Sequence, residues 1–297
     1  MNSTRSNKIK IEDSHDAYQK VGVVILNYNS SEDTIRLCET LLKQEGTNVE
    51  IIIVDNNSSR QDKAKLRILA SDRITVIENT ENLGFARGNN VGIVYARNKL
   101  NCDFVFVINS DSLMADNNVI KTLISYYSEG VGLISPECYG FDKKTFQLPY
   151  CLSKGNSIKE LIKVIALVVW QSIKATLNKE WSIHKAMNIQ FEPSDFKYII
   201  QGNAYILTPS FFEHYSMIFP RTFLYLEETA LLWYLKKARL STVYVTEAIV
   251  LHKEAGSNKK SNRKKEEYKA KEMRKSLFSI IPIWFMSERK ILEKYNQ

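Results

Sequence analysis

Apolar residues in the first half of the chain come in short unbroken runs, and each run ends in a small polar cluster. The runs occupy residues 21–29 (VGVVILNYN), 49–59 (VEIIIVDNNSS) and 102–112 (CDFVFVINSDS). Runs of this length, rich in valine and isoleucine, predict strands that are buried on both faces of a sheet. Residues 73–90 predict a shorter strand followed by a glycine-containing loop.

Helical patterns separate these runs. Residues 30–44 place four isoleucine and leucine side chains at roughly helical spacing, with Ser30 or Ser31 as the expected N-cap. Residues 91–100 predict a second helix. Strands that alternate with helices predict an α/β fold with a mainly parallel sheet and helices on both of its faces.

Three of the predicted strands carry polar side chains at their carboxyl ends. The clusters are Asn27-Tyr28-Asn29, Asp55-Asn56-Asn57 and Asn109-Ser110-Asp111. Asn, Asp and Ser favour turns, so a single cluster predicts no more than a turn. The carboxyl ends of neighbouring parallel strands meet at one edge of a sheet, where α/β proteins bind ligands. Three clusters on one rim therefore predict a pocket.

Beyond residue 130 the alternation of strands and helices is less regular. The pattern predicts a strand and turn (130–141), a long helix with a broad apolar face and basic edges (157–177), strands around Gly202 (196–215), an extended start followed by an amphipathic helix (223–239) and a pair of strands (241–258).

The charge of the chain favours an anionic partner. Its 297 residues carry a formal net charge of +8, and the isoelectric point is near 9.1. Nucleic acid, a membrane surface and phosphorylated small molecules all fit this charge. The four cysteines match no zinc or redox spacing, which favours buried thiols in a reducing compartment. No signal peptide or spanning helix is predicted, so we expect a cytoplasmic protein.

Seven blocks of the sequence, in order, resemble the family 2 glycosyltransferases. They are VVILNYN, IIIVDNNSS, NLGFARGNNVGI, VFVINSD, QGNAYILTPSFF, FLYLEETALLWYLKKA and VLHKEAGS. Within this family the chain looks most like bacterial rhamnosyltransferase-like enzymes of capsular and exopolysaccharide synthesis. The resemblance implies a GT-A fold and inverting transfer from a UDP- or dTDP-sugar donor to a growing glycan. It also implies a divalent metal, Mn2+ or Mg2+.

The resemblance covers about residues 21–258 and suggests how the chain is organised. We expect a flexible leader (1–20), a GT-A domain (21–258) and a basic, amphipathic C-terminal extension (259–297). Within the domain, residues 21–115 are the expected nucleotide-binding half and residues 116–258 the acceptor half.

Two residues are implied to hold the metal beside the diphosphate of the donor. Asp111 supplies a carboxylate, the kind of ligand that Mg2+ and Mn2+ prefer. The family pattern here is acid-any-acid, whereas this chain has Asn109-Ser110-Asp111, so one carboxylate remains and Asn109 can contact the sugar or ribose. His252 is implied to complete the metal shell or contact the diphosphate. A turn aspartate and a structural histidine are the alternatives.

The donor nucleotide is implied to lie along the first two strand ends. Asp55 is expected to accept a hydrogen bond from the N3–H of a pyrimidine, which both uracil and thymine carry. Asn27, Tyr28 and Asn29 are expected along the same base or ribose, and Asn57 is expected to join this donor site.

The block NLGFARGNN is implied to approach the base or the diphosphate. Gly84 and Gly88 permit a close backbone approach, and Asn90 opens a helix whose N-terminus favours phosphate. Arg87 is the expected charged contact, with a solvated arginine as the alternative.

The block LYLEET is implied to carry the general base. The family usually has Glu-Asp here, and this chain has Glu227-Glu228, with Glu228 in the position of the base. Its longer side chain shifts the carboxylate, so geometry has to decide the assignment. An acidic pair favoured by a helix dipole is the alternative. Gly202 and Asn203 are expected to line the donor-sugar or acceptor pocket.

The C-terminal region combines many lysines and arginines (253–275) with a short apolar run (277–286). This run is too short to span a membrane but suits the interface with anionic lipid. A lipid-linked acceptor at the inner face of the cell membrane would explain both features. A solvated helix, core packing or a homodimer contact are the alternatives.

Other function classes are weighed against this interpretation. A nucleotidyltransferase would need a glycine-rich basic loop after the first strand, and NYNSSEDT is neither. A nucleic-acid binder is disfavoured because no reading motif or aromatic-basic platform is present. A non-catalytic sugar- or partner-binding module on the same fold stays open, because Asn109 and Glu228 depart from the family pattern.

Overall fold

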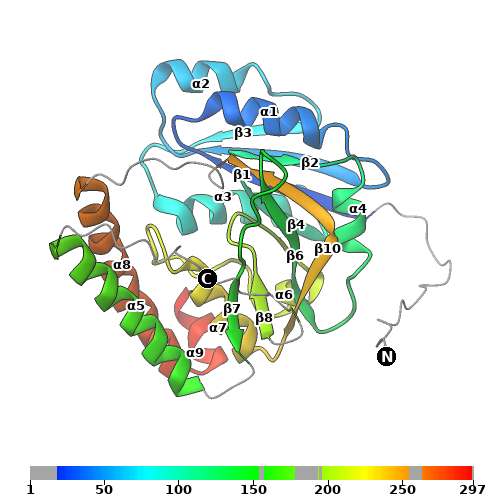
Figure 1. The fold of residues 1–297 in the computed structure, drawn as a ribbon. Helices are drawn as coiled ribbons and strands as arrows, with labels where there is room; N and C mark the ends of the chain where they lie inside the picture. Colours follow the sequence, from blue (N-terminus) through cyan, green and yellow to red (C-terminus); the bar gives the residue numbers. More distant parts are fainter. Residues whose placement is uncertain (1–18, 154–156, 178–192, 194–195, 254–262, 296–297) are drawn as a thin grey trace.

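The computed structural model describes residues 19–153, 157–177, 193, 196–253 and 263–295, and Figure 1 shows the arrangement of its elements. In chain order the elements are β1 (Lys20–Asn27), α1 (Ser31–Leu41), β2 (Asn48–Asp55), α2 (Arg60–Arg67), β3 (Ile74–Glu78), α3 (Gly84–Asn98), β4 (Phe104–Asn109), β5 (Ser112–Met114), α4 (Val119–Ile124), β6 (Val131–Gly140), β7 (Tyr150–Ser153), α5 (Ser157–Leu177), β8 (Phe196–Ile200), β9 (Ala204–Leu207), α6 (Pro209–His214), α7 (Glu227–Lys237), β10 (Ser241–His252), α8 (Arg263–Phe285) and α9 (Glu288–Tyr295).

An eight-stranded sheet with the strand order β3-β2-β1-β4-β9-β6-β10-β5 forms the centre of the fold. The first four strands are parallel, β9 is antiparallel to both of its neighbours, and β10 is parallel to β6 and antiparallel to β5. A separate two-stranded sheet pairs β7 with β8. The mainly parallel sheet with helices on both faces confirms the predicted α/β architecture.

The strand register brings the predicted polar clusters to one rim. Asn27 at the end of β1 is paired with Asp55 at the end of β2, and Asn109 at the end of β4 is paired with Leu26. All of these strands run in the same direction, so their carboxyl ends lie at the same edge. The expected shared rim is therefore confirmed.

Alternate residues of the central strands feed two hydrophobic cores, one on each face of the sheet. Val23, Ile53 and Phe106 point toward the core under α1, α2 and α4. Val24 and Val107 point toward the opposite core, which holds α3, α6, α7, α8 and α9. This period of two explains why the strands read as unbroken apolar runs, since both faces are buried.

The elements differ from the sequence prediction at several places. Helix α3 begins at Gly84 rather than at residue 91, so most of the expected glycine loop is its first two turns. Residues 241–252 form one strand, β10, with an irregular register near Val245, and not a pair of strands. Helix α4 was not predicted; it covers the sheet with the side chains of Val119, Ile120 and Leu123.

The C-terminal helices belong to the main core. Ile280 and Ile283 of α8 and Ile291 of α9 are fully buried in the cluster that also holds Val24 and Trp233. The core therefore continues beyond residue 258, where the extension was expected to begin. The expected leader lies outside the described residues except for its last two positions, and Lys20 is already in β1.

The sequence also predicted buried cysteine thiols and no membrane-spanning helix. Cys38, Cys102 and Cys138 are buried free thiols, and burial raises the pKa of each to about 12. Across the described segments, no helix has the length and apolar character needed to cross a membrane.

Candidate active site

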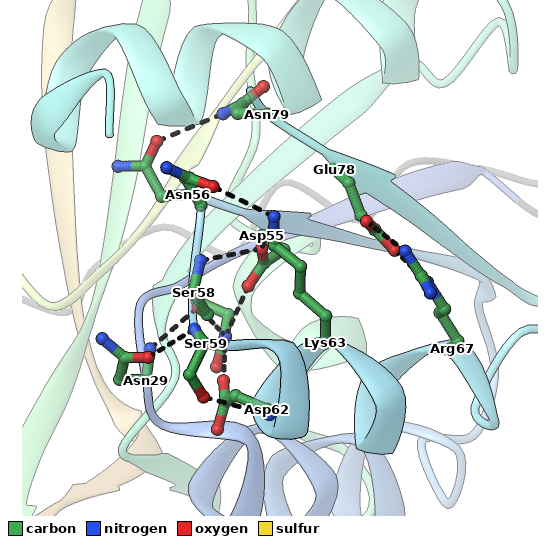
Figure 2. A network of polar contacts seen from close by, with 12 residues as sticks. Asn29, Asp55, Asn56, Ser58, Ser59, Asp62, Lys63, Arg67, Glu78 and Asn79 are labelled. Atoms are coloured by element: carbon green, nitrogen blue, oxygen red, sulfur yellow. Dashed lines mark hydrogen bonds and ion pairs between the residues drawn. The ribbon is translucent and has the colours of Figure 1, made fainter. Parts of the chain in front are cut away.

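The ends of β1 and β2 are joined by a buried polar network, part of which is drawn in Figure 2. The Asn27 amide nitrogen donates to Asp55 Oδ1 at 3.0 Å and to Asp62 Oδ2 at 2.8 Å. The other carboxylate oxygen of Asp55 accepts from the backbone N–H of Ser58 at 3.0 Å, and Lys63 Nζ lies 3.9 Å away. Both Asn27 and Asp55 are fully buried. Asp55 therefore exposes no atom that a ligand could contact in this arrangement.

Asn56, which sequence reasoning left without a role, holds the segment before α3. Its amide nitrogen donates to Asn82 Oδ1 at 2.9 Å and to the carbonyl of Gly84 at 3.2 Å. Its carbonyl oxygen accepts from the backbone N–H of Leu83 at 2.9 Å and from Asn79 Nδ2 at 3.2 Å, the last shown in Figure 2. Every polar atom of this buried amide is thus used to position the start of α3.

The residues just past the two strands face the outside. Asn29 and Asn57 adopt positive φ angles of 53° and 65°, which asparagine tolerates better than other non-glycine residues. Asn29 Oδ1 accepts from the backbone N–H of Ser59 at 2.8 Å, and Asn57 Oδ1 accepts from Lys63 Nζ at 3.0 Å. Tyr28 is 53% exposed. These three side chains are the exposed part of the donor site expected at the first two strand ends.

Most of the block 82–90 forms the start of α3, where an open loop was expected. Added Cβ atoms at Gly84 and Gly88 would collide with Phe223 and Leu26, so packing against the protein explains both glycines. The Asn90 side chain is buried and exchanges two hydrogen bonds, of 2.8 and 3.0 Å, with the backbone of Ile218. Arg87 is the one exposed residue of this block.

Asp111 and His252, 141 positions apart in the sequence, are brought into direct contact. His252 Nε2 lies 3.0 Å from Asp111 Oδ1. The antiparallel pairing of β5 with β10 sets His252 opposite Ser112, the neighbour of Asp111. Burial raises the pKa of the Asp111 carboxyl, but the hydrogen bond and charge of His252 outweigh it and hold that pKa below its usual range. The carboxylate is therefore ionised at neutral pH.

Gln147 contacts the other ring nitrogen of His252 and was missed by sequence reasoning. Its Nε2 and Oε1 atoms lie 3.0 and 3.1 Å from His252 Nδ1. Asn203 Nδ2 donates to Gln147 Oε1 at 3.5 Å, and the Asn203 carbonyl accepts from the backbone N–H of Asn109 at 2.8 Å. Gln147 lies in a segment without any recognisable block, so the sequence carried no signal for it.

Ser110 joins the end of β4 to the start of α1. Its hydroxyl lies 3.0 Å from the hydroxyl of Ser30, which in turn donates to Asn27 Oδ1 at 3.1 Å. The three predicted clusters thus form one connected rim, with the Asn27 cluster in the middle and Asp111 toward β10.

Glu227 and Glu228 form the first turn of α7 and enter it through a strained turn. Tyr225 and Leu226, directly before the pair, have φ angles of 72° and 68°, a region that bulky residues rarely occupy. Backbone strain of this kind gathers at functional sites. Glu228 lies over the backbone of Gly202, where a Cβ atom would collide with its carboxylate.

The surroundings of this acidic pair favour the protonated forms. Burial raises the pKa of both carboxyl groups, and the charge of Glu228 raises that of Glu227 further. One carboxyl oxygen of Glu227, Oε1, is buried without a hydrogen-bond partner among the described residues. The structure therefore brings Glu228 and Gly202 together and raises the pKa of the Glu228 carboxyl.

The side chains near Asp111 offer few ligands for a divalent metal. The described part of the chain contains no group of three or more His, Cys, Asp or Glu residues that could hold a metal. Asp111 and His252 nevertheless offer one oxygen and one nitrogen donor in contact with each other. This set fits an ion such as Mn2+ or Mg2+ that takes its other ligands from phosphate oxygens and water.

Comparison with known proteins agrees with this fold. The model of the family "Glycosyl transferase family 2" matches residues 22–223. A mannosyltransferase from Pyrobaculum calidifontis, solved with GDP-Man and Mn2+, has a TM-score of 0.52 at 12% identity, covering 95% of this chain and 77% of that chain. A glucosyl-3-phosphoglycerate synthase from Mycobacterium tuberculosis, solved with Mn2+, UDP and phosphoglyceric acid, has a TM-score of 0.51 at 14% identity, covering 90% and 79%.

A curated relative adds a similarity in sequence. The low-salt glycan biosynthesis hexosyltransferase Agl10 of Haloferax volcanii is 32% identical over 117 residues, which are 39% of this chain and 36% of that protein. The match thus spans about a third of the relative's length. The fold is that of the GT-A glycosyltransferases. Because the family model matches more than half of the chain, the chain belongs to glycosyl transferase family 2.

Proposed function

We propose that this protein is an inverting, metal-dependent glycosyltransferase that builds a bacterial surface polysaccharide. Its donor is a UDP- or dTDP-sugar, with hexosyl or rhamnosyl transfer as the reaction, and its acceptor is a hydroxyl of a growing, lipid-linked glycan. The observation that carries this proposal is the placement of two groups around one sheet. Asp111 touches His252 at the sheet edge, and Glu228 lies against Gly202 with a raised pKa.

The reaction breaks the bond between the anomeric carbon and the diphosphate, and the leaving group gains negative charge. A divalent ion held by Asp111 and His252 would supply Lewis-acid neutralisation of that charge. Glu228 accepts the proton of the acceptor hydroxyl as the hydroxyl oxygen attacks the anomeric carbon from the side opposite the diphosphate. Attack from that side inverts the configuration of the sugar.

The donor contacts are assigned to the side chains that a ligand can reach. Asn27 and Asp55 are enclosed, so they support the rim from within. Tyr28, Asn29 and Asn57 lie beyond the strand ends and are exposed, so in this proposal they contact the base and ribose. Arg87 is left to approach the diphosphate or the base from the start of α3.

The Asn109 and Asn203 side chains complete the donor site in this proposal. The backbone carbonyl of Asn203 accepts a hydrogen bond from the backbone N–H of Asn109, so Asn203, the neighbour of Gly202, lies beside Asn109 of the strand rim. Asn109, Ser110 and Gly202 would then line the path of the sugar from the metal pair to Glu228.

The comparisons support the class of reaction and leave the substrates as proposals. Agl10 is a hexosyltransferase of glycan biosynthesis, and the two structural neighbours were solved with a nucleotide or nucleotide sugar and Mn2+. We place the protein at the cytoplasmic face of the cell membrane as a peripheral protein, because a lipid-linked acceptor is presented there.

Isothermal titration with UDP, dTDP and GDP, each with and without Mn2+, tests the donor and the metal. We expect Mn2+-dependent binding of UDP or dTDP that is lost in Asp111→Ala and kept in Asp72→Ala, a matched change at an exposed aspartate. Binding of GDP alone, or of no nucleotide by the folded protein, would contradict the pyrimidine donor.

Release of nucleoside diphosphate in the presence of an acceptor separates the enzyme from its main rival, a non-catalytic sugar-binding module on the same fold. We expect release by the native protein and little release by Glu228→Gln, with nucleotide binding unchanged. Nucleotide binding without release, over a panel of lipid-linked glycans, would favour the binding module.

A further inference from the structure

Helix α5 exposes a row of aliphatic side chains. Ile162, Ile165, Val169 and Ile173 are 58%, 36%, 50% and 46% exposed, and their spacing of three and four residues sets them on one face of the helix. The opposite face, with Val164 and Val168, is buried in the main core. The helix is therefore apolar on two sides, and folding uses only one of them.

Helix α8 lies beside α5 and adds exposed aromatic side chains. Figure 1 shows the two helices side by side along the outside of the molecule, away from the sheet. Arg274 Nη1 of α8 donates to Ser172 Oγ of α5 at 3.0 Å, which fixes their relative position. Phe278 and Phe285 of α8 are 75% and 76% exposed. We call these two side chains and the aliphatic row of α5 the outer face.

The charged side chains exposed on these two helices are almost all basic. Within the described residues they are Lys159 and Lys163 on α5, and Lys264, Glu267, Lys271, Arg274 and Lys275 on α8. An apolar helix face bordered by lysine and arginine is typical of helices that lie in the interface of an anionic membrane. A second copy of the chain would bring like charges toward each other, whereas anionic lipid neutralises them.

We propose that the outer face docks on an anionic membrane surface. The aliphatic and aromatic side chains enter the boundary between headgroups and acyl chains, and the bordering lysines and Arg274 contact the anionic headgroups. The proposal rests on the proposed function in one respect, since a lipid-linked acceptor gives the enzyme a reason to be there. It differs from the sequence expectation, because α8 buries Leu277, Ile280 and Ile283 and keeps only its outward residues for lipid.

Vesicle flotation of the full chain, without nucleotide or acceptor, tests the docking surface. The vesicles contain either phosphatidylcholine alone or phosphatidylcholine with phosphatidylglycerol. We expect binding to the anionic vesicles that weakens with added salt and falls about tenfold in the double variant Ile162→Gln/Val169→Gln. The matched control Leu42→Gln/Ile68→Gln changes two exposed apolar residues at the ends of α1 and α2 and should bind as the native protein does.

A second pair of variants separates charge from apolar contact. Lys159→Gln/Lys163→Gln should weaken binding to the anionic vesicles about tenfold. The control Lys43→Gln/Lys99→Gln removes two exposed lysines elsewhere and should leave binding unchanged. Circular dichroism and thermal melting establish that each variant is folded. Glutamine keeps the helix propensity of these positions high, so loss of α5 itself is not expected.

The outcomes decide between lipid and a second copy of the chain. Failure of the native protein to bind anionic vesicles, or equal loss in the control variants, overturns the proposal. A dimer in sedimentation velocity that is lost in Ile162→Gln/Val169→Gln, without vesicle binding, assigns the outer face to self-association instead. Because flotation needs no transfer reaction, a protein that binds vesicles but transfers no sugar would refute the proposed function and leave this surface standing.

Discussion

The proposed role of Glu228 as general base depends on the surroundings of its carboxylate. It lies over Gly202, and burial raises its pKa above the ordinary range of a glutamate. A protonated carboxyl cannot accept the proton of the acceptor, so the rate should rise with pH through this raised pKa. The acid limb of the kcat profile is therefore expected above pH 4.5, the ordinary value, and kcat should rise as the pH increases through this limb.

Substitution tests the same residue. We expect Glu228→Gln to lower kcat by about 10²–10⁴-fold, the usual contribution of a general base, with Kd for the nucleotide unchanged. Glu213→Gln, an exposed glutamate on α6, is the control and should keep the native rate. An acid limb at the ordinary carboxylate pKa, or a Glu228→Gln variant with native kcat, would remove Glu228 from this role.

Gln147 contacts His252, and we expect it to hold the ring in the orientation that the proposed metal requires. A metal takes the lone pair of Nε2, which requires the ring proton on Nδ1, and Gln147 Oε1 lies 3.1 Å from that atom as its acceptor. We expect Gln147→Leu to weaken Mn2+ binding about ten- to hundredfold, as loss of such a supporting contact commonly does. Gln147→Glu keeps an acceptor oxygen and should restore most of the affinity. The readout is Mn2+ titration followed by electron paramagnetic resonance in the presence of UDP; native affinity in Gln147→Leu would contradict this role.

At the scale of elements, one carboxylate joins α1 to α2 and to β1. Asp62 Oδ1 accepts from the backbone N–H of Ser31 at the start of α1, at 3.1 Å, and its Oδ2 accepts from Asn27. Ser30, the expected N-cap, makes no side-chain cap of its own. The carboxylate from another helix thus takes over the capping of α1, which no local sequence pattern could have revealed.

Loss of this carboxylate should destabilise the protein in a pH-dependent way. Asp62→Ala removes the cap of α1 and one hydrogen bond of the Asn27 amide, which keeps Asp55 Oδ1 and Ser58 Oγ as acceptors. We expect a cost of about 1–2 kcal/mol in the free energy of unfolding, mainly from the lost cap. Burial raises the pKa of Asp62, but hydrogen bonds from Ser31, Asn27 and Ser58 outweigh it and lower that pKa in the folded state. The contribution is therefore complete above the unfolded pKa and is lost as the pH falls through the folded one. Urea unfolding at neutral and acid pH measures this effect. The difference in the free energy of unfolding between the native protein and Asp62→Ala should shrink in acid, whereas Asp72→Ala should match the native protein at both pH values.

The sequence predicted which residues stand at the strand ends but not which way they turn. The Asn27 and Asp55 side chains point inward and are hydrogen-bonded within the buried network, whereas Asn29 and Asn57 turn outward at positive φ. Composition cannot separate these pairs, because both consist of residues that suit turns. The start of α3 was misjudged for a related reason. Its glycines suggested a loop, yet Gly84 has a positive φ of 78° and packs against Phe223, and Gly88 packs against Leu26.

At the scale of the whole molecule, long-range pairing builds the site. The insertion of antiparallel β9 between β4 and β6 places Asn203 beside Asn109, and the pairing of β5 with β10 places His252 beside Asp111. Periodicity predicts the strands but not their order across the sheet. The resemblance to a family supplied Asp111, His252 and Glu228 as candidates, and only the sheet topology explains why residues so far apart meet.

The packing of α8 leads to a prediction about stability. The sequence suggested a membrane-binding extension outside the core, whereas the structure packs α8 into the core. A basic extension that served only a membrane would tolerate truncation of its apolar side chains. In the structure Ile280 is fully buried, whereas Phe278, two residues away on the same helix, is 75% exposed. Trp284 of α8 also packs edge-to-face on Trp233 of α7, with ring centroids 4.8 Å apart.

Ile280→Ala should therefore lower the free energy of unfolding by about 2–5 kcal/mol, the usual cost of a cavity in a core. The matched change Phe278→Ala should stay within about 0.5 kcal/mol, as exposed positions commonly do. Urea unfolding followed by tryptophan fluorescence measures both, since the Trp233–Trp284 contact reports directly on the docking of α8. Equal and small losses in the two variants would mean that α8 is an appendage of the fold; a large loss in Ile280→Ala alone would mean that the glycosyltransferase core requires it.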